Sequence, residues 1–575
     1  MVVVAQEKID RYTNQGWWGQ HTLWDLFVDH CQQRPQATAV VDAANRSDFA
    51  YEHKQSLTWL SLSQAVNALS WHLLQRGLNR DDVVVAQMPN CVEQFVVYLA
   101  CAKLGLIVSP VPIQFRENEL HTILKITQAK AVVTFASLRQ KERQLDSQGM
   151  WLALQSEHTH LKNMIVWGDQ QDQHIQIKDM LKGVSDQQLQ AIDLAHKNAN
   201  ITANDVFTIC WTSGTEAQPK GVPRSHNEWL VVAPSIIEAG NLKPFARLLN
   251  PFPLINMAGF STGFAAWLVL GGTVIQHQPF QLDVFLHQLR TEQIDYTVCA
   301  PAILNTLLQN EHLLEGIDFQ RLSRIGSGSA PLSDWMVRGF EEKYGVRIVN
   351  YFGSNEGAAL TASDIDVPDP QWRAAYFPRA GVEGFDWKIS TTKKIKTRLV
   401  DLLTEEEIVE SGKTGELRFE GPTIFSGYFG APEMTATAFD DQGFYKTGDL
   451  FQIAGPKHQY YQFVGRSKDL IIRGGMKISS EEVENLLLAC PGVKEAAVVA
   501  VPDQIMGEKI CACIATDDEQ NVSLKSINDH LKNQKHIAIF KLPEYLMFVT
   551  TLPRNPVGKI LKRDLREQAR LKFIS

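Results

Sequence analysis

The chain has 575 residues, of which 44% are hydrophobic and 21% are charged. This length is too great for a single hydrophobic core, so we expect at least two domains, and the composition is typical of a globular protein in water. The formal net charge of −8 provides no basic surface for nucleic acid, which excludes nucleic-acid binding as the expected function.

Nothing near the start of the chain predicts a targeting signal. The segment Met1–Asp10 becomes charged too early for a signal peptide. Gly259–Gln276 lacks charged side chains, but its glycines predict a buried helix followed by a strand instead of a membrane span. The eight cysteines contain no CxxC pair, which indicates reduced thiols. We therefore expect a soluble cytoplasmic protein, either a monomer or a homodimer.

Residues 1–200 alternate between helical and strand-like patterns. Helices are predicted at His21–Arg34, Leu60–Arg76 and Val92–Leu104, and strands at Val83–Gln87, Ile107–Pro112 and Ala131–Thr134. Strands that alternate with helices of this length predict parallel sheets that are covered on both faces. The polar residues 143–200 are expected to form a surface excursion.

The segment Trp211–His226 follows a predicted buried strand, Asp205–Cys210, and precedes a helical run from about Asn227. Its hydroxyls, its glycine and Lys220 are typical of polyphosphate-binding loops, because backbone N–H groups and short side chains approach the oxygens and the lysine adds a charge. It is not a Walker loop, since no Ser or Thr follows the lysine. Considered alone, an ordinary Ser/Thr/Gly turn explains the pattern equally well.

Two further glycine-rich segments, Ile325–Pro331 and Asn350–Gly357, lie at or just after predicted strands. Ligands of parallel α/β sheets bind beyond the C-terminal ends of the strands, so these segments suggest one shared site. From about residue 380 to 465, shorter strands with glycine turns predict a small β-rich subdomain.

A compact mixed segment begins near Gly465. Ser479 and Glu482 form a predicted capping box for a helix that extends to about Leu488. The remaining predicted elements are strands at Glu495–Val501, Ile510–Ala515 and Tyr545–Val549 and a helix at Leu524–Lys532. Its roughly 107 residues are enough for a separate domain.

Six motifs, in this order, resemble those of the adenylate-forming superfamily, which includes acyl- and aryl-CoA ligases, luciferases and the adenylation domains of peptide synthetases. They are Thr212–Gly221, Tyr351–Glu356, Gly415–Tyr428, Tyr445–Leu450, Gly465–Asp469 and Pro553–Lys559. The resemblance covers essentially the whole chain. It implies an α/β fold with a large N-terminal AMP-binding domain of parallel sheets and a β-rich subdomain (1–465), a hinge (466–468) and a small mobile α+β C-terminal domain (469–575).

The resemblance implies ATP-dependent activation of a carboxylic acid to an acyl-adenylate, with release of pyrophosphate, followed by transfer to a pantetheine thiol. ATP, Mg²⁺ and CoA, or the phosphopantetheine of a carrier protein, are the implied cofactors. Pro223–His226, and Arg466–Asp469 with Arg473–Lys477, resemble the branch that activates aryl and cyclic acids. We expect an aryl, cyclic or medium-chain acid and CoA as acceptor; the alternative is a stand-alone enzyme that loads a carrier protein of a nonribosomal peptide or siderophore-type pathway.

The resemblance also implies a role for each motif residue. Lys559, Glu356 and Thr212 are the implied catalytic residues, with Glu356 and Thr212 as the Mg²⁺ ligands. The implied nucleotide-binding residues are Ser213, Gly214, Thr215, Lys220, Ser327, Gly328, Ser329, Ala330, Tyr351, Phe352, Gly353, Ser354, Asp449 and Arg466. The implied acid pocket contains Asn256, Met257, Gly259 and Gly328, and Lys468 stands at the hinge position.

The chemistry needs these residue types. Negative charge builds up on the phosphates during adenylation, so fixed donors, a cation and a lysine stabilise the transition state. Each residue also has an ordinary explanation when it is considered singly: Asp449 as a turn residue, Glu356 as a solvated charge, Arg466 as the partner of Asp469, and Lys559 as an exposed lysine. Six motifs in the family's order favour the functional interpretation.

The sequence departs from the family pattern at the phosphate loop and at the acid pocket. Glu216 and Ala217 stand in the loop where the family usually has Thr and Gly, which leaves a non-catalytic adenylate-binding relic as one alternative. Met257 stands where siderophore enzymes keep an Asn that reads a ring hydroxyl, so we expect an apolar acid without that hydroxyl. Gly259–Gly263, with Ser261 at its centre, fits a nucleophile elbow and makes a serine hydrolase a remote alternative.

Overall fold

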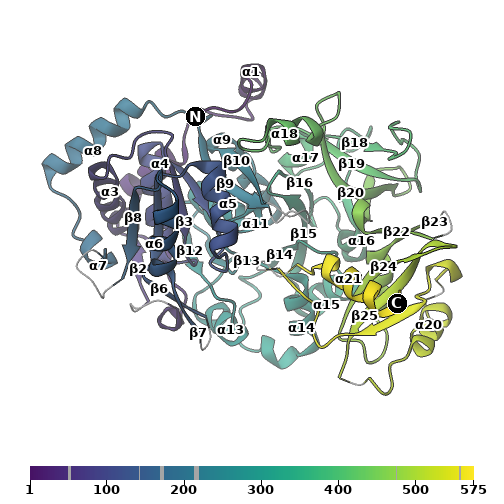
Figure 1. Ribbon diagram of the computed structural model, residues 1–575. Coiled ribbons are helices and arrows are strands. Elements are labelled where there is room, and N and C mark those ends of the chain that lie inside the picture. Colours follow the sequence, from purple (N-terminus) through teal and green to yellow (C-terminus); the bar gives the residue numbers. More distant parts are fainter. Residues whose placement is uncertain are drawn as a thin grey trace. The chain divides into compact units, whose positions relative to one another are not determined.

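The computed structural model describes residues 1–49, 54–140, 143–168, 174–212, 219–473, 476–517, 519–535, 537–555 and 559–574 (Figure 1). The chain divides into two compact units. Unit 1 contains Met1–Lys396 and Glu420–Gly443, and unit 2 contains Thr397–Phe419 and Phe444–Ser575. Each unit is described by itself below.

The first sheet of unit 1 has six strands in the order β10-β9-β4-β3-β5-β8. The strands are β3 (Val83–Gln87), β4 (Ile107–Pro110), β5 (Ala131–Phe135), β8 (Asn163–Trp167), β9 (Val206–Thr212) and β10 (Lys220–Ser225). All neighbours run parallel except β9 and β10, which are antiparallel. Side chains alternate between the two faces, so that Val84 packs into one hydrophobic cluster and Val85 into another.

The second sheet of unit 1 has eight strands in the order β16-β15-β14-β13-β11-β12-β1-β2. The strands are β1 (Thr38–Val41), β2 (Ser56–Thr58), β11 (Arg247–Asn250), β12 (Thr273–Gln276), β13 (Tyr296–Cys299), β14 (Arg324–Gly328), β15 (Arg347–Ser354) and β16 (Gly357–Ala362). Its central strands are parallel, and the two edge pairs, β1–β2 and β15–β16, are antiparallel. The described strands thus confirm parallel sheets as the basis of the fold.

Helices cover both sheets of unit 1. They are α1 (Gln6–Asn14), α2 (Leu23–Gln33), α3 (Trp59–Gln75), α4 (Val92–Leu104), α5 (Glu117–Thr127), α6 (Ser147–Glu157), α7 (Ile177–Met180), α8 (Asp186–Ala199), α9 (His226–Leu230), α10 (Ala233–Ala239), α11 (Met257–Phe260), α12 (Ala266–Leu270), α13 (Leu282–Thr291), α14 (Pro301–Gln309), α15 (Asp334–Tyr344), α16 (Pro370–Ala375), α17 (Ser390–Lys394) and α18 (Pro432–Ala438). A turn of π-helix, Ser261–Ala265, joins α11 to α12.

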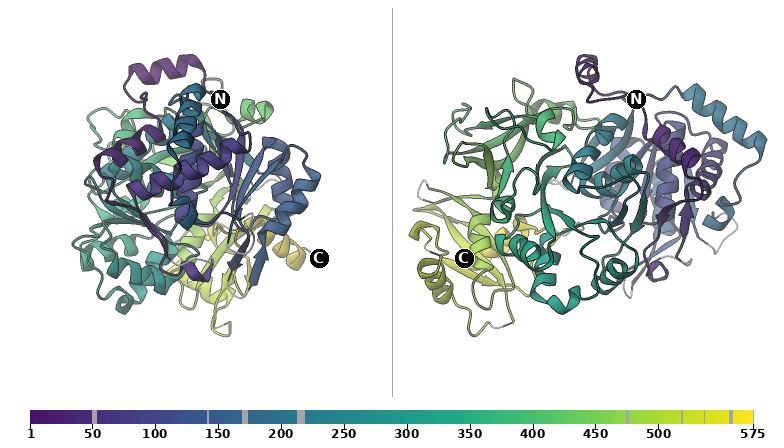
Figure 2. Two further views of the ribbon diagram at one scale, coloured as in Figure 1. Left: turned by 90° about the vertical axis from the view of Figure 1, so that its left-hand side faces the viewer. Right: turned by 180° about the vertical axis from the view of Figure 1, so that it is seen from behind.

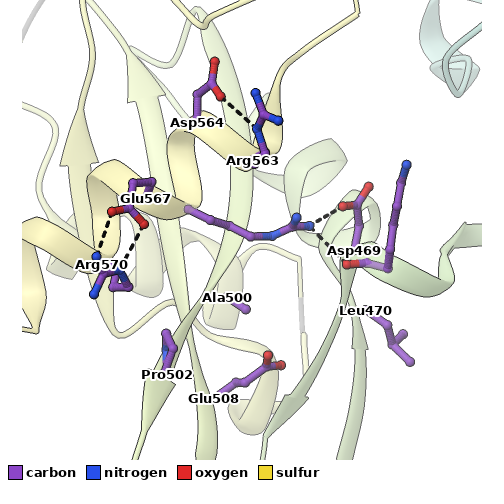
Figure 3. A pocket seen from close by; sticks show the side chains of 11 residues that line it. Asp469, Leu470, Ala500, Pro502, Glu508, Arg563, Asp564, Glu567 and Arg570 are labelled. Atoms are coloured by element: carbon purple, nitrogen blue, oxygen red, sulfur yellow. Dashed lines mark hydrogen bonds and ion pairs between the residues drawn. The ribbon is translucent and has the colours of Figure 1, made fainter. Parts of the chain in front are cut away.

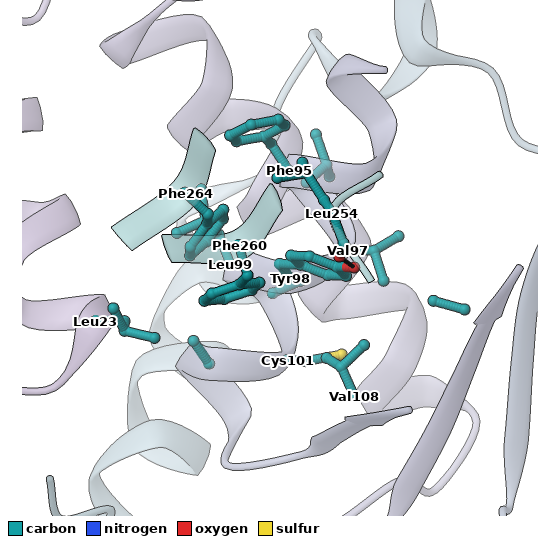
Figure 4. Packing of buried hydrophobic residues seen from close by; sticks show 14 of the residues in the cluster. Leu23, Phe95, Val97, Tyr98, Leu99, Cys101, Val108, Leu254, Phe260 and Phe264 are labelled. Carbon is teal, nitrogen blue, oxygen red and sulfur yellow. Dashed lines mark hydrogen bonds between the residues drawn. The ribbon is translucent and has the colours of Figure 1, made fainter. Parts of the chain in front are cut away.

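Helix α4 lies in the hydrophobic core of unit 1, and every one of its residues is buried. Most of its side chains are apolar, and the charge of its buried Glu93 is balanced by an ion pair with Arg46. Its Phe95 and Tyr98 pack against the rings of Phe260 and Phe264, with centroids between 5.5 and 5.8 Å apart (Figure 4). The same cluster takes side chains from strands of both sheets, including Val84 of β3 and Val274 of β12. The core therefore links the two sheets within unit 1.

The sequence prediction was wrong for much of residues 143–200. β8 is an edge strand of the six-stranded sheet, and Trp151 on α6 is fully buried. Trp151 donates to the side-chain oxygen of Gln87 at 2.8 Å, which satisfies its indole N–H in the core. Only the later part behaves as expected: α8 lies at the periphery of unit 1 in Figures 1 and 2, and Ile192 is its buried residue.

Unit 2 contains an antiparallel sheet and a mixed sheet. The first sheet contains β18 (Lys396–Val400), β19 (Thr414–Glu420), β20 (Tyr445–Ala454) and β21 (Tyr460–Arg466). A short 3-10 turn follows at Ser467–Asp469. The mixed sheet contains β22 (Leu470–Arg473), β23 (Met476–Ser479), β24 (Glu495–Asp503), β25 (Gly507–Ala515) and β26 (Tyr545–Phe548). Helices α19 (Ser480–Leu487) and α20 (Leu524–Asn533) cover one face of the mixed sheet, and α21 (Lys562–Phe573) covers the other. The predicted α+β character of this segment is confirmed.

The predicted capping box at α19 is half formed. The Ser479 hydroxyl accepts from the N–H of Glu482 at 3.1 Å, as the sequence indicates. The Glu482 carboxylate, however, accepts from Lys541 at 2.6 and 2.7 Å. An ion pair with a neighbouring element has replaced the reciprocal bond of the box.

Candidate active site

The phosphate-type segment is a hairpin. Thr212 ends β9 and Lys220 begins β10, and the two residues are paired across the hairpin. The sequence did not predict β10, because Gly221 and Pro223 disfavour a strand; β10 is an edge strand, where proline is tolerated. Ser213, Gly214 and Thr215, together with Glu216 and Ala217, lie outside the described residues.

Glu356 occupies the turn between β15 and β16. Glu356 is 7% exposed, and its Oε1 accepts from the hydroxyl of Tyr428 at 3.1 Å. Its carbonyl accepts from the N–H of Phe425 at 2.8 Å. Nζ of Lys220 lies 5.3 Å from the centre of the Tyr428 ring. Tyr428 therefore contacts both the candidate metal ligand and the candidate phosphate lysine.

Asn355 links the turn to two other predicted site segments. Its Nδ2 donates to the carbonyl of Trp211 at 3.0 Å, next to Thr212. Its Oδ1 accepts from the N–H of Met257 at 2.8 Å. The end of β9, the β15–β16 turn and the start of α11 are thus held together by one side chain.

Arg224 on β10 forms hydrogen bonds to the same turn. It is fully buried, and its Nε and Nη2 donate to the carbonyl of Asn355 at 3.0 and 2.8 Å. Its Nη1 donates to the carbonyl of Thr423 at 2.7 Å. Burial lowers the pKa of Arg224, while Glu228 and Glu356 oppose that shift. The guanidinium therefore places a buried cation near Glu356.

The predicted acid-pocket residues meet at the start of α11. The side chain of Asn256 caps this helix by accepting from the N–H of Gly259 at 3.1 Å, and Met257 is buried. A Cβ on Gly259 would lie 2.0 Å from the carbonyl oxygen of Pro253, so the close approach requires glycine. Ser261 is helical, and its Oγ donates to the carbonyl of Met257 at 2.6 Å. A nucleophile elbow needs a strand-to-helix turn, so the serine-hydrolase alternative was wrong.

The segment around Ser327 lies in and just beyond β14. Gly328 is paired with Tyr351 of β15, and a Cβ there would lie 2.4 Å from the Tyr351 carbonyl oxygen. The Ser327 hydroxyl donates to the carbonyl of Cys299 at 2.8 Å, and the hydroxyls of Tyr351 and Tyr296 lie 2.8 Å apart. Ser329, with φ of 69°, Ala330, Gly353 and Ser354 are exposed, and Phe352 is half-buried. These residues form the exposed rim at the ends of the two strands.

Asp449, Arg466 and Lys468 form a separate charged group in unit 2. Asp449 of β20 is paired across the sheet with Arg466 of β21, and Nε of Arg466 lies 3.2 Å from Oδ1 of Asp449. Lys468 lies in the 3-10 turn that follows, and burial together with Arg466 lowers its pKa. Burial raises the pKa of the neighbouring Glu481 to about 7, and its buried Oε2 has no hydrogen-bond partner among the described residues.

A pocket of about 600 Å³ lies beside the hinge position in unit 2 (Figure 3). Arg566 of α21 crosses it, donating to the Asp469 carboxylate and to the carbonyl of Lys468. The lining residues include four cations and four carboxylates: Lys468, Arg563, Arg566 and Arg570 with Asp469, Glu508, Asp564 and Glu567. Because these charges balance, we assign the pocket no anionic ligand. One of its ion pairs, between Arg566 and Asp469, instead joins α21 to the turn at the predicted hinge.

Lys559 lies in a turn just before α21. Its N–H donates to the side chain of Asn555 at 2.9 Å, and its carbonyl accepts from the N–H of Asn555 at 2.8 Å. Pro556, Val557 and Gly558 lie outside the described residues. The lysine itself is exposed.

The structure therefore separates the predicted site residues into two sets. Unit 1 brings Thr212, Lys220, Glu356 and the acid-pocket residues together, and unit 2 carries Asp449, Arg466, Lys468 and Lys559. Sequence reasoning missed the side chains of Asn355, Arg224 and Tyr428. All three lie inside segments that the sequence singled out, so a polar side chain within a motif was the available signal.

Two family models match the chain. "AMP-binding enzyme" matches residues 27–429, and "AMP-binding enzyme C-terminal domain" matches residues 482–559. The chain belongs to the AMP-binding enzyme family. It is an AMP-forming acid–thiol ligase, as the six motifs predicted.

Individual relatives agree with this assignment. The chain is 30% identical to the medium-chain fatty-acid–CoA ligase of Escherichia coli (97% of this chain, 92% of the relative) and 27% identical to enterobactin synthase component E of the same species (98% and 97%). An anthranilate CoA ligase in complex with anthranoyl-AMP superposes with a TM-score of 0.78, at 20% identity, over 97% of this chain and 98% of that one. This likeness confirms the predicted fold class.

None of the described helices is both long and apolar enough to cross a membrane. Within the same part of the chain, no group of three or more His, Cys, Asp or Glu side chains is arranged to hold a metal ion. The boundary at residue 465, the hinge at 466–468 and the individual residue roles stay predictions.

Proposed function

We propose that the protein activates an apolar aryl, cyclic or medium-chain acid with ATP and transfers the acyl group to CoA. A carboxylate oxygen bonds to the α-phosphorus, the bond to the β-phosphate oxygen breaks, and pyrophosphate leaves. The sulfur of CoA then bonds to the acyl carbon, AMP leaves, and the thiol proton passes to solvent. The observation that carries the proposal is the Asn355 link, which joins the candidate acid pocket to the end of β9 beside Glu356.

The residues of unit 1 supply the groups for the first step. Lys220 and the Thr212 hydroxyl bind phosphate oxygens beyond the end of β9, where short side chains and backbone N–H groups suit an anion. The buried Met257 contributes to the apolar wall of the acid pocket. Within unit 2, Asp449 accepts from the ribose hydroxyls, oriented by Arg466.

Glu356 and Thr212 fit a Mg²⁺ ion that ATP itself helps to coordinate. Mg²⁺ takes one or two carboxylates together with substrate phosphates and water, so a single buried carboxylate suffices. When bound, the ion neutralises charge that develops on the phosphates. The chain fixes the turn that carries this carboxylate, because the N–H of Phe425 donates to the backbone carbonyl of Glu356 at 2.8 Å.

The test is pyrophosphate release from ATP over a panel of aryl, cyclic and medium-chain acids, each with and without CoA. We expect release with apolar acids and an acyl-CoA product when CoA is present. Absence of release with every acid, while ATP still binds, would instead establish a binding relic.

Carrier-bound phosphopantetheine is the second candidate acceptor, because the chain resembles a component of enterobactin synthase along most of its length. Comparing CoA with a phosphopantetheinylated carrier protein, at equal thiol concentration, distinguishes the two acceptors. Faster acyl transfer to CoA supports the main proposal.

A further inference from the structure

Tyr428 connects two parts of the candidate nucleotide site that lie far apart in the sequence. Its hydroxyl donates to Glu356 in the β15–β16 turn, and its ring lies under the ammonium of Lys220 at the start of β10. One side chain therefore contacts both the group assigned to the metal and the group assigned to the phosphates. All three residues belong to unit 1.

The backbone at Tyr428 is fixed by its neighbours. Gly427 has a φ of 149°, and a Cβ there would lie 2.5 Å from Cγ2 of Thr435, so the position requires glycine. The N–H of Tyr428 donates to Oγ1 of Thr435 at 2.9 Å. The N–H of Phe429 donates to the carbonyl of Gly221 at 2.8 Å, directly after Lys220. These bonds place Tyr428 between the start of β10 and the β15–β16 turn.

The side chain is fixed as well. Its ring packs edge-on against the fully buried ring of Phe425, with the centroids 4.9 Å apart. The N–H of Phe425 bonds to the carbonyl of Glu356, and Ile424 pairs with Gly357. The segment that carries Tyr428 thus lies next to the Glu356 turn. These backbone contacts keep the Tyr428 hydroxyl close to Oε1 of Glu356.

We propose that Tyr428 is a positioning residue for acyl-adenylate formation: its hydroxyl fixes the Glu356 carboxylate so that the second oxygen is presented to Mg²⁺, and its ring holds the Lys220 ammonium at the phosphates. The inference rests on the proposed function and deepens it. Groups that hydrogen-bond to a metal ligand orient that ligand, and losing them typically lowers metal affinity or activity by about 10- to 100-fold. An ammonium over an aromatic ring is also held by the ring's quadrupole.

The experiment compares Tyr428→Phe, which removes only the hydroxyl, with Tyr428→Leu, which also removes the ring. Tyr344→Phe is the matched control, because the Tyr344 hydroxyl donates to Glu311 at the same 3.1 Å but lies on α15, outside the candidate site. Two quantities are measured for each variant: the Mg²⁺ dependence of pyrophosphate release, and the calorimetric affinity for ATP at low and saturating Mg²⁺ without acid. Thermal melting confirms that each variant is folded.

For Tyr428→Phe we expect the Mg²⁺ concentration at half-maximal rate to rise about tenfold. Its ATP affinity should fall at low Mg²⁺ and be nearly normal at saturating Mg²⁺. Tyr428→Leu should weaken ATP binding by a further factor of about two to five, the scale of a cation–π contact. This further loss should disappear in a Lys220→Ala background, since the ring would then hold no cation. Tyr344→Phe should match the wild type in every measurement.

An unchanged Mg²⁺ dependence in Tyr428→Phe would overturn the role of the hydroxyl, even with a fully active wild type. A ring effect that persists undiminished in Lys220→Ala would overturn the role of the ring. If the wild-type protein neither binds Mg·ATP nor releases pyrophosphate, the proposed function fails and the positioning role fails with it. The three outcomes are distinguishable because binding and turnover are measured separately.

Discussion

In unit 1, hydrogen bonds to backbone groups hold the Glu356 turn, whereas in unit 2 ion pairs hold Asp449, Arg466 and the turn that carries Lys468. In unit 1, Arg224 and Asn355 bond to carbonyl and N–H groups around the Glu356 turn. In unit 2, Arg466 pairs with Asp449, and Arg566 pairs with Asp469 beside Lys468.

The difference matches what each half of the proposed reaction needs. Adenylation depends on donors and charges that are fixed before the transition state forms, which backbone bonds to neighbouring strands provide. A hinge must let φ and ψ change, and ion pairs at a partly exposed turn exchange partners at lower cost than buried backbone bonds do. The predictions below test the two kinds of anchoring, beginning with the largest expected effect.

The largest effect should come from Glu356→Gln. The amide keeps the shape of the side chain and can still accept from Tyr428, but it removes the negative charge proposed to bind Mg²⁺. Adenylation should fall by about 100-fold or more, the scale of losing one preorganised electrostatic group. Pyrophosphate release with a good acid measures it, and an unchanged melting temperature shows that the fold is intact. Near-normal activity would place the metal site elsewhere.

Arg224→Met should reduce both stability and adenylation. Three hydrogen bonds to the carbonyls of Asn355 and Thr423 are lost, so we expect destabilisation by about 2–4 kcal/mol and roughly a tenfold loss of activity per folded molecule. Arg373→Met is the matched control, since Arg373 is also fully buried and donates to the carbonyls of Ile348, Val367 and Pro368. Because Arg373 also forms an ion pair with Glu341, its loss should destabilise the protein at least as much. Equal activity losses in the two variants would mean that Arg224 acts only through stability.

Met257→Ala should change which acids are used. A pocket side chain contacts the acid but not ATP, so relative rates for a large and a small acid should change by about tenfold, while the KM for ATP stays within about twofold. Met336→Ala, which truncates a fully buried methionine on α15, is the control and should leave the acid preference unchanged. A shift in the KM for ATP as large as the shift in acid preference would remove Met257 from the pocket.

The smallest expected effect is a change in the pH dependence of stability, and it concerns Glu481, next to the charged group of unit 2. Burial raises the pKa of Glu481 from 4.5 to about 7; Lys562 and Arg466 oppose this shift, and Glu484 and Asp449 add to it. Between about pH 4.5 and 7 the folded protein therefore keeps a proton that the unfolded chain releases, so stability decreases as pH rises through this range.

Glu481→Gln should remove that decrease. Its melting temperature should exceed that of the wild type by about 2–4 °C at pH 8 and approach it near pH 5. Glu482→Gln, which alters the adjacent carboxylate paired with Lys541, should keep the wild-type pH dependence. A wild-type slope in Glu481→Gln would assign the titration to another group.

Periodicity predicted the core elements closely, because burial on both faces leaves little choice of residue. The predicted strand Val83–Gln87 and helix Val92–Leu104 coincide with β3 and α4. β10 was missed because its Gly221 and Pro223 are strand breakers that only an edge position tolerates. Residues 143–200 were misassigned because their polar composition concealed Trp151 and β8.

The motifs located the candidate site residues but not the bonds that hold them. Arg224 meets Asn355 across 131 positions of sequence, and Tyr428 meets Glu356 across 72. No local pattern specifies such a pairing, because it depends on how the two sheets and the segment Glu420–Gly443 fold within unit 1. Singling out the polar residues inside the motifs would have included the right side chains without their partners.

The central proposal is that unit 2 acts in both half-reactions through two conformations: Lys559 is needed for adenylation, and a backbone change at Lys468 is needed for thiol transfer. One paired measurement tests this proposal most directly. Adenylate formation and thioester formation from a pre-made acyl-adenylate are measured separately in Lys559→Ala and Lys468→Pro. Lys559→Ala should slow adenylate formation by about 100-fold or more and leave thioester formation nearly unchanged. Lys468→Pro, which fixes φ near −65° and restricts Ser467, should do the reverse. If both variants slow both half-reactions equally, the two-conformation account is contradicted.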